Sequence, residues 1–112
     1  MYYIYILRCN GGELYTGITS DIMRRLNEHS SQSKKCAKYT RSHKITALEG
    51  LWTAKNRSLA SKLEHRIKKL PRSKKLKLIE NPCLVSNLVE DNEFFNPITI
   101  KISNLDIKNP LV

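Results

Sequence analysis

The stretch from Tyr2 to Thr19, YYIYILRCNGGELYTGIT, decides the fold because it predicts two strands joined by a tight turn. Residues 2–8 are β-branched and aromatic with little polar content, which is typical of a buried strand. The sequence NGG at 10–12 is a turn signal that suits a hairpin. Residues 13–18 then return as a second strand, so we predict a β-hairpin here.

The chain after the hairpin predicts a helix, a loop and a third strand. Thr19 or Ser20 can cap a helix in which apolar residues recur at helical spacing, namely Ile22, Met23 and Leu26. Residues 30–44 are polar and basic, as in a surface loop. Residues 45–54 predict a third strand.

A long amphipathic helix is predicted from Ser58, because four apolar residues form one stripe: Leu59, Leu63, Ile67 and Leu70. Pro71 ends it, and residues 72–79 predict a short basic helix. The composition changes after residue 81, where alternation over 98–102 gives a weak strand signal. We therefore divide the chain into a domain at 1–80 and an extension at 81–112, which packs on the core or mediates an interaction.

The charge is strongly positive, with 20 Lys and Arg against 10 Asp and Glu, a formal net charge of +10. The 112 residues fit one domain, and 40% hydrophobic residues allow a modest core. Such a charge attracts polyanions, of which nucleic acid is the commonest. Two alternatives stay open: a basic surface that serves only solubility, and an anionic membrane surface bound through Lys74, Lys75 and Lys77.

Several classes of protein are disfavoured by what the sequence lacks. No window is apolar enough to span a bilayer, and the first residues do not have the features of a secretory signal. The three cysteines, Cys9, Cys36 and Cys83, have no paired spacing, so neither a disulfide framework nor a zinc site is indicated. We expect a cytoplasmic protein with no membrane partner and no small-molecule cofactor.

Five residues could together hydrolyse a phosphodiester. Tyr5 and Tyr15 sit on the two strands of the hairpin, where they can be neighbours. Arg25 and His29 are four apart, so they share one helix face. Glu64 is a lone carboxylate on the long helix, where it could hold a divalent metal that generates hydroxide. An arginine suits charge on the phosphate, and a tyrosine could accept a proton if cations lower its pKa from about 10.

Each of these residues also has an ordinary structural explanation. Aromatic residues on strands are usually core residues, and a helix arginine is usually a solvated charge. A histidine near a helix end often caps or packs, and a glutamate among lysines is often an ion-pair partner. Residues alone therefore indicate a basic α+β domain that binds nucleic acid.

The ordered motifs resemble the GIY-YIG nuclease family, and most closely its small single-domain bacterial branch. The motifs are YIY at 3–5, YTG at 15–17, the run GITSDIMRRLNEH at 17–29, AKYTR at 37–41 and LEHRIKKL at 63–70. Tyr5, Tyr15 and Arg25 follow at intervals of ten positions (15 − 5 and 25 − 15). The resemblance covers about residues 2–80.

The resemblance implies a three-stranded antiparallel sheet flanked by helices, and a role for each of the five residues. Tyr5 and Tyr15 would activate or position the attacking water. Arg25 would stabilise the pentavalent phosphate, and His29 would assist proton transfer or contact the phosphate. Glu64 would hold a single Mg²⁺ or Mn²⁺ ion. The implied activity is that of a metal-dependent DNA endonuclease in repair or recombination, directed by structure or backbone.

We expect the nucleic acid to contact a set of glycine and cationic residues: Gly17, Arg24, Lys34, Lys35, Lys38, Arg41 and Lys68. Gly17 would keep the strand end open to the substrate backbone. The alternative function is a non-catalytic module that binds nucleic acid, and RNA and the oligomeric state stay open. Tyr3 stands where the family name has Gly, and Asn81 and Asn87 are positional candidates for a supporting asparagine of the family.

Overall fold

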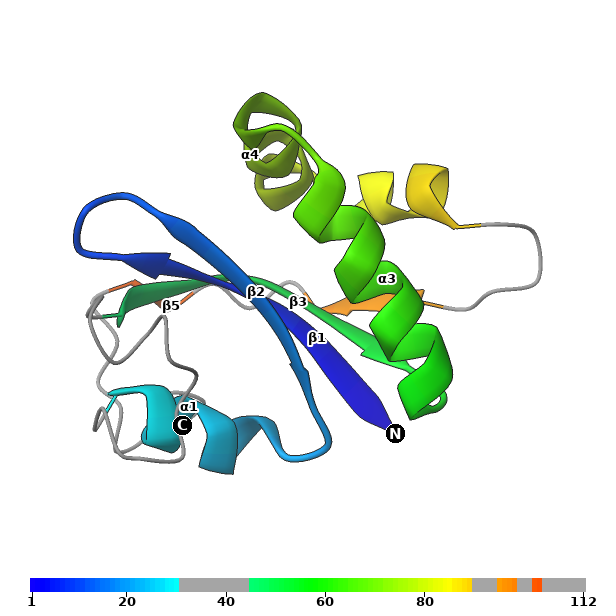
Figure 1. Cartoon of the computed structure of the whole chain (residues 1–112), viewed down its shortest axis with the longest axis horizontal. Helices are drawn as coiled ribbons and strands as arrows, with labels where there is room; N and C mark the ends of the chain where they lie inside the picture. The colour runs from blue at the N-terminus through cyan, green and yellow to red at the C-terminus, as the bar shows by residue number, and fades with distance from the viewer. Residues whose placement is uncertain (31–44, 90–94, 99–101, 104–112) are drawn as a thin grey trace.

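An antiparallel sheet is the centre of the computed structural model, which describes residues 1–30, 45–89, 95–98 and 102–103. Its main strands are β1 (Tyr2–Cys9), β2 (Leu14–Thr19) and β3 (Ile45–Ala54), in the spatial order β2-β1-β3. β1 pairs antiparallel with both neighbours. The described residues therefore contain the predicted three-stranded antiparallel sheet (Figure 1).

The turn between β1 and β2 follows the predicted glycine pair. Gly12 has a φ of 87°, a backbone conformation that glycine adopts without steric cost. Its N–H donates to the carbonyl of Cys9 over 2.9 Å, and the N–H of Cys9 donates to the carbonyl of Glu13 over 2.9 Å. This closure fixes the register in which Tyr5 pairs with Gly17.

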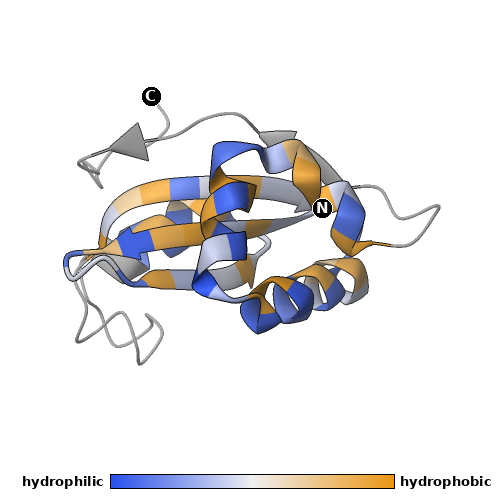
Figure 2. Cartoon of the chain, turned by 90° about the horizontal axis from the view of Figure 1, so that it is seen from above, coloured by the Kyte–Doolittle hydropathy of each residue, from blue (hydrophilic) through white to orange (hydrophobic). Residues whose placement is uncertain are grey.

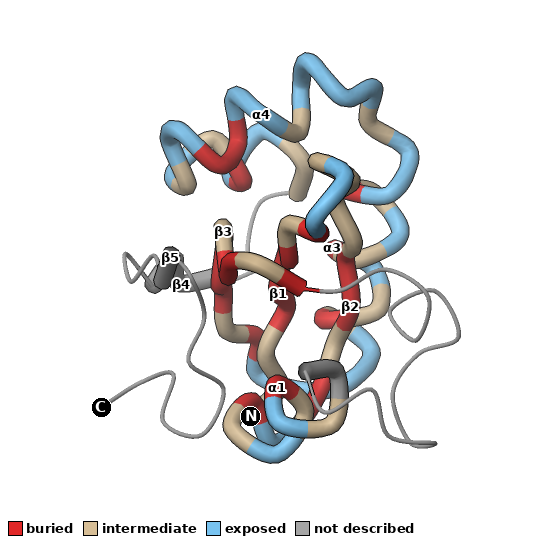
Figure 3. The backbone as a smooth tube through the Cα atoms, turned by 90° about the vertical axis from the view of Figure 1, so that its left-hand side faces the viewer, coloured by how far each residue is buried: buried red, intermediate tan, exposed pale blue. Residues whose placement is uncertain are grey.

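Helices cover the sheet on opposite faces. α1 (Ile22–Ser30) lies on one face, and α3 (Arg57–Lys69) and α4 (Arg72–Glu80) lie on the other (Figures 1 and 3). Hydrophobic and hydrophilic residues occupy different sides of α3, as the predicted stripe requires (Figure 2). The fold is α+β, as predicted.

The helix starts differ slightly from those predicted. Asp21, rather than Thr19 or Ser20, caps α1, because its Oδ1 accepts from the N–H of Arg24 at 3.1 Å. The Thr19 hydroxyl instead accepts from the N–H of Asp21 at 3.1 Å, which shapes the turn before the helix. α3 begins at Arg57 rather than Ser58, because the side chain of Asn56 accepts from the N–H of Leu59 at 3.0 Å.

β1 separates two hydrophobic clusters, because successive side chains of a strand point to opposite faces. Ile4 and Ile6 pack toward α3 together with Trp52. Tyr5 and Leu7 pack toward α1, with Leu26 and Leu51 among their neighbours. All four β1 residues are at most 1% exposed, which confirms the prediction of a buried strand.

The described part of the C-terminal extension packs on the domain. The 3₁₀ helix η1 (Pro82–Leu88) places Val85 in the cluster below α3, and the indole Nε1 of Trp52 donates to the carbonyl of Pro82 at 3.1 Å. β4 (Phe95–Ile98) and β5 (Ile102–Ser103) both pair antiparallel with β3. In the described residues, the sheet therefore has five strands rather than the three predicted. Among the described helices, none has the length and apolar character needed to cross a membrane.

Candidate active site

An open, polar cleft of about 260 Å³ lies beside β2, the strand at the edge of the sheet. Residues from the first two turns of α1 and the first residue of α3 line it, together with residues of β1 and β2. Its lining residues are Tyr2, Ile18, Thr19, Ser20, Arg24, Arg25, Glu28 and Arg57. The cleft brings together three guanidinium groups, which is the chemistry that binds a phosphate.

Arg25 is the most firmly held of these arginines. Its Nη1 lies 3.0 Å from Oε1 of Glu28, one turn along α1, and its guanidinium also donates to the hydroxyl of Tyr5. The Arg25 side chain is 22% exposed and that of Glu28 16%. A guanidinium fixed on two sides, with part of its surface in the cleft, is prepared to bind an anion.

The Tyr5 side chain extends from β1 across Gly17 of the neighbouring strand β2, and its hydroxyl reaches Arg25. A Cβ atom at Gly17 would lie 2.5 Å from the Tyr5 hydroxyl oxygen and 2.6 Å from Cζ, so only glycine leaves room for the ring. The ring centroids of Tyr5 and Tyr15 are 6.4 Å apart with an interplanar angle of 44°, a distance at which aromatic pairs interact. The two predicted tyrosines are thus neighbours.

Tyr5 is 1% exposed, and this burial raises the pKa of its hydroxyl above the ordinary value. The nearby Tyr15 raises the pKa further and Glu64 adds to the rise, while the hydrogen bond and charge of Arg25 oppose it. A tyrosine that accepts a proton near neutral pH needs cations to lower its pKa, but at Tyr5 burial outweighs the effect of the one arginine. The Tyr5 phenol is therefore neutral near pH 7 and suits hydrogen bonding better than proton removal.

Glu64 lies on α3 with its side chain 23% exposed, and its charge acts on the Tyr5 hydroxyl. Its Oε2 lies 3.5 Å from Nζ of Lys68, which is 51% exposed. No three His, Cys, Asp or Glu side chains in the described ranges gather as a metal cluster. Mg²⁺ keeps several waters and needs only one or two carboxylates, so Glu64 fits such an ion if Lys68 turns away.

The other predicted contacts have different outcomes. Gly17 is buried beneath the Tyr5 ring, so the expected opening to a substrate backbone is wrong; the ring fills the space. Arg24 is exposed in the cleft. The backbone of His29 lies in α1, but its side chain lies outside what the structure describes, as do four predicted cations, Lys34, Lys35, Lys38 and Arg41.

Sequence reasoning missed two residues of the cleft, Arg57 and Glu28. Arg57 stands seven positions before Glu64 (64 − 57), which is close to two helical turns, so both residues share one side of α3. Glu28 stands three positions after Arg25 and could have been found as a helical ion-pair partner. Both residues could therefore have been found from their helical spacing to the predicted residues Glu64 and Arg25.

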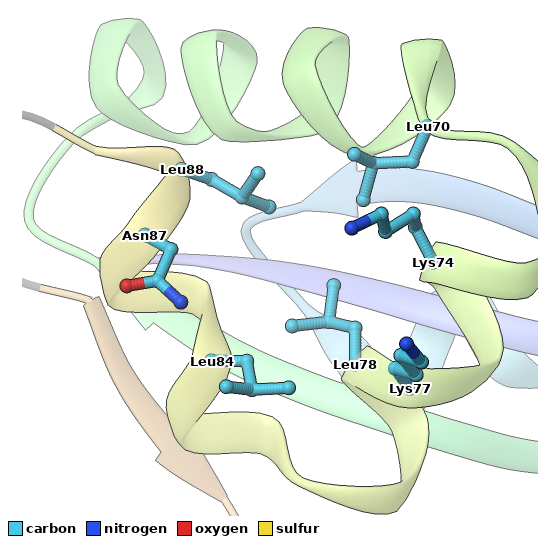
Figure 4. A pocket seen from close by; sticks show the side chains of 7 residues that line it. All are labelled: Leu70, Lys74, Lys77, Leu78, Leu84, Asn87 and Leu88. Atoms are coloured by element: carbon cyan, nitrogen blue, oxygen red, sulfur yellow. The ribbon is translucent and has the colours of Figure 1, made fainter.

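A larger cavity of about 340 Å³ lies elsewhere, among α3, α4 and η1 (Figure 4). Leucines and two lysines form most of its lining, which consists of Leu70, Lys74, Lys77, Leu78, Leu84, Asn87 and Leu88. None of the five predicted catalytic residues lines it. Asn87 belongs to this cavity and Asn81 is an exposed residue at the end of α4, so neither asparagine lines the arginine cleft.

Comparison with known proteins identifies the domain. The model of the GIY-YIG catalytic domain matches residues 1–77. A UPF0213 protein of Fusobacterium nucleatum is 41% identical over 100 residues, covering 89% of this chain and 95% of the relative. A UPF0213 protein of Yersinia pestis is 42% identical over 93 residues, covering 82% and 96%.

A solved structure is also similar, the solution NMR structure of a UPF0213 protein from Bacillus halodurans. It is 34% identical, with 80% of this chain and 98% of that chain covered and a TM-score of 0.45. The matched residues 1–77 contain both tyrosine strands, α1 and Glu64. The chain therefore belongs to the GIY-YIG family of nuclease domains, among small bacterial UPF0213 proteins.

Proposed function

We propose that this protein is a metal-dependent endonuclease that hydrolyses phosphodiester bonds of DNA. The observation that carries the proposal is Arg25, which Tyr5 and Glu28 hold at the wall of an arginine-lined cleft. Its guanidinium would bind the phosphoryl oxygens and stabilise the charge that grows on them in the transition state. The net charge of +10 would add attraction for the DNA backbone.

The two tyrosines would have different tasks. Tyr5, neutral and buried, would position Arg25 through its hydroxyl. Tyr15 is only partly buried, and its phenol would orient the attacking water. His29 would assist proton transfer from the helix that carries Arg25. This division follows from burial, because a sealed phenol has no access to water.

Glu64 would hold a Mg²⁺ or Mn²⁺ ion. When bound, such an ion supplies a Lewis acid that lowers the pKa of a bound water and neutralises phosphate charge. Lys68, which pairs with Glu64, would turn toward the nucleic-acid backbone. We extend the proposal to a cytoplasmic enzyme of DNA repair or recombination. Its catalytic residues would all lie in a domain at residues 1–80, and residues 81–112 would form an extension.

The test is cleavage of plasmid, duplex, branched and single-stranded DNA and of RNA, with Mg²⁺ or with EDTA. We expect Mg²⁺-dependent cutting that is lost in Glu64→Gln and Arg25→Ala. Glu80→Gln is the matched control, because Glu80 is an exposed carboxylate at the end of α4, and it should cut normally. Equal cutting with EDTA would refute the metal role, and binding without cutting would favour the non-catalytic module.

A further inference from the structure

Two arginines of the cleft differ from Arg25 in their surroundings. Arg24 and Arg57 are exposed and face the cleft from α1 and α3, whereas Arg25 contacts Glu28 and Tyr5. Within the described ranges, neither Arg24 nor Arg57 makes an ion pair with a carboxylate. Two guanidinium groups without an ion-pair partner in the described ranges therefore line the same cleft as Arg25 and Glu28.

The position of Arg57 is unfavourable for the helix that carries it. Arg57 is the first residue of α3, which has no acidic residue in its first turn, whereas the Asp21 carboxylate caps the helix that carries Arg24. The N-terminal end of a helix carries partial positive charge, so a cation there is destabilising. A bound anion between the two side chains would remove this repulsion.

The cleft has the size and lining for a phosphate with its sugar. Its volume is about 260 Å³, and beside the arginines it offers the hydroxyl of exposed Ser20. Tyr2 and Ile18 add an apolar surface on the sheet side, against which a sugar can pack. Arg25 lines the same cleft as Arg24 and Arg57, so a second phosphate held here would neighbour the one that Arg25 binds.

We propose that Arg24 and Arg57 form a clamp for a non-scissile phosphate of the nucleic-acid strand, next to the phosphate on Arg25. The proposal rests on the proposed function for the identity of the strand. Arg57 is the new residue, and its task is to bind and orient the substrate across the cleft. A guanidinium suits this task because it donates two parallel hydrogen bonds to phosphate oxygens.

The test measures binding of a short fluorescein-labelled DNA duplex by anisotropy in EDTA, over a series of salt concentrations. The variants are Arg57→Ala, Arg57→Lys and Lys69→Ala, the last a matched control. Lys69 is an exposed cation in the last turn of the same helix and lines neither cavity. Arg57 is exposed, so melting of Arg57→Ala should occur at the wild-type temperature or slightly above.

We expect Arg57→Ala to weaken binding about tenfold and to lower the salt slope by about 0.9, the loss of one phosphate contact. Arg57→Lys should keep the slope and lose part of the affinity, and Lys69→Ala should bind nearly as the wild type. Wild-type affinity in Arg57→Ala, or an equal loss in Lys69→Ala, would overturn the clamp. The assay measures binding in the absence of cleavage. A protein that binds DNA through Arg57 but cuts no substrate would therefore refute the proposed nuclease function and leave the clamp supported.

Discussion

Gly17→Ala is the substitution that most directly tests the geometry of the site. The added Cβ would lie 2.5 Å from the Tyr5 hydroxyl oxygen, whereas ordinary contact begins at 3.4 Å, so the ring must move by about 0.9 Å. The ring is 1% exposed and packed on all sides, so it cannot move freely. Overpacking of this kind costs about 1–3 kcal/mol of unfolding free energy.

The displacement of the Tyr5 ring should lower the cleavage activity as well as the stability. The Tyr5 hydroxyl accepts a hydrogen bond from Arg25, so movement of the ring shifts or frees the guanidinium. A misplacement of about 1 Å can reduce an enzyme's rate by about 10²-fold. We therefore expect Gly17→Ala to lose cleavage activity beyond what its remaining folded fraction accounts for.

Urea unfolding of four proteins measures the effect: wild type, Gly17→Ala, Tyr5→Leu and the double variant. Leucine is shorter than tyrosine, so Gly17→Ala in the Tyr5→Leu background should be neutral or slightly stabilising, because alanine fits a strand better than glycine. The coupling energy between the two sites should be about 1 kcal/mol or more. A Gly17→Ala variant that is as stable and active as the wild type would refute the crossing of Tyr5 over Gly17.

Three further changes have definite outcomes. Burial raises the pKa of Tyr5 in the folded protein, so the stability linked to its neutral hydroxyl is complete below pH 10. Above pH 10 the free energy of unfolding should fall by up to about 1.4 kcal/mol per pH unit. Tyr5→Phe should remove this fall in urea titrations at alkaline pH. Lys68→Ala should strengthen apparent Mg²⁺ binding up to about fivefold in cleavage titrations, since an exposed ion pair with Glu64 contributes about 0.2–1 kcal/mol. Trp52→Phe should cost about 1–3 kcal/mol in urea unfolding, because the carbonyl of Pro82 loses its donor; an unchanged midpoint would contradict that.

The hairpin and the long helix could be predicted because their signals are local. The NGG turn and the run of β-branched and aromatic residues in β1 indicate the strands, and the stripe through Leu63 and Ile67 indicates α3. The caps were harder, because Thr19, Ser20 and Asp21 can all cap a helix and only the turn geometry selects one. β4 was missed as a separate strand because its partner, β3, is distant in sequence.

The candidate site was predictable as a set of residues but not in its inner arrangement. The hairpin placed Tyr5 beside Tyr15 and the resemblance added Arg25, yet the burial of Tyr5 depends on a cross-strand partner without a side chain. The strand glycine was itself a signal of close approach, but sequence could not say whether substrate or protein approached it. The tertiary fold places Arg57 in the same cleft as residues of α1. Helical spacing could therefore indicate on which side of α3 Arg57 lies, but not which residues of other elements lie near it.

One side chain in this fold serves both architecture and recognition. Tyr5 fills the layer between the sheet and α1 with Leu7 and Leu26, and the same ring ends in the group that orients Arg25. Resistance to heat and catalytic competence therefore cannot vary independently at this position. A variant selected for a tighter interior here would move the guanidinium, and a variant selected for a different guanidinium placement would loosen the interior.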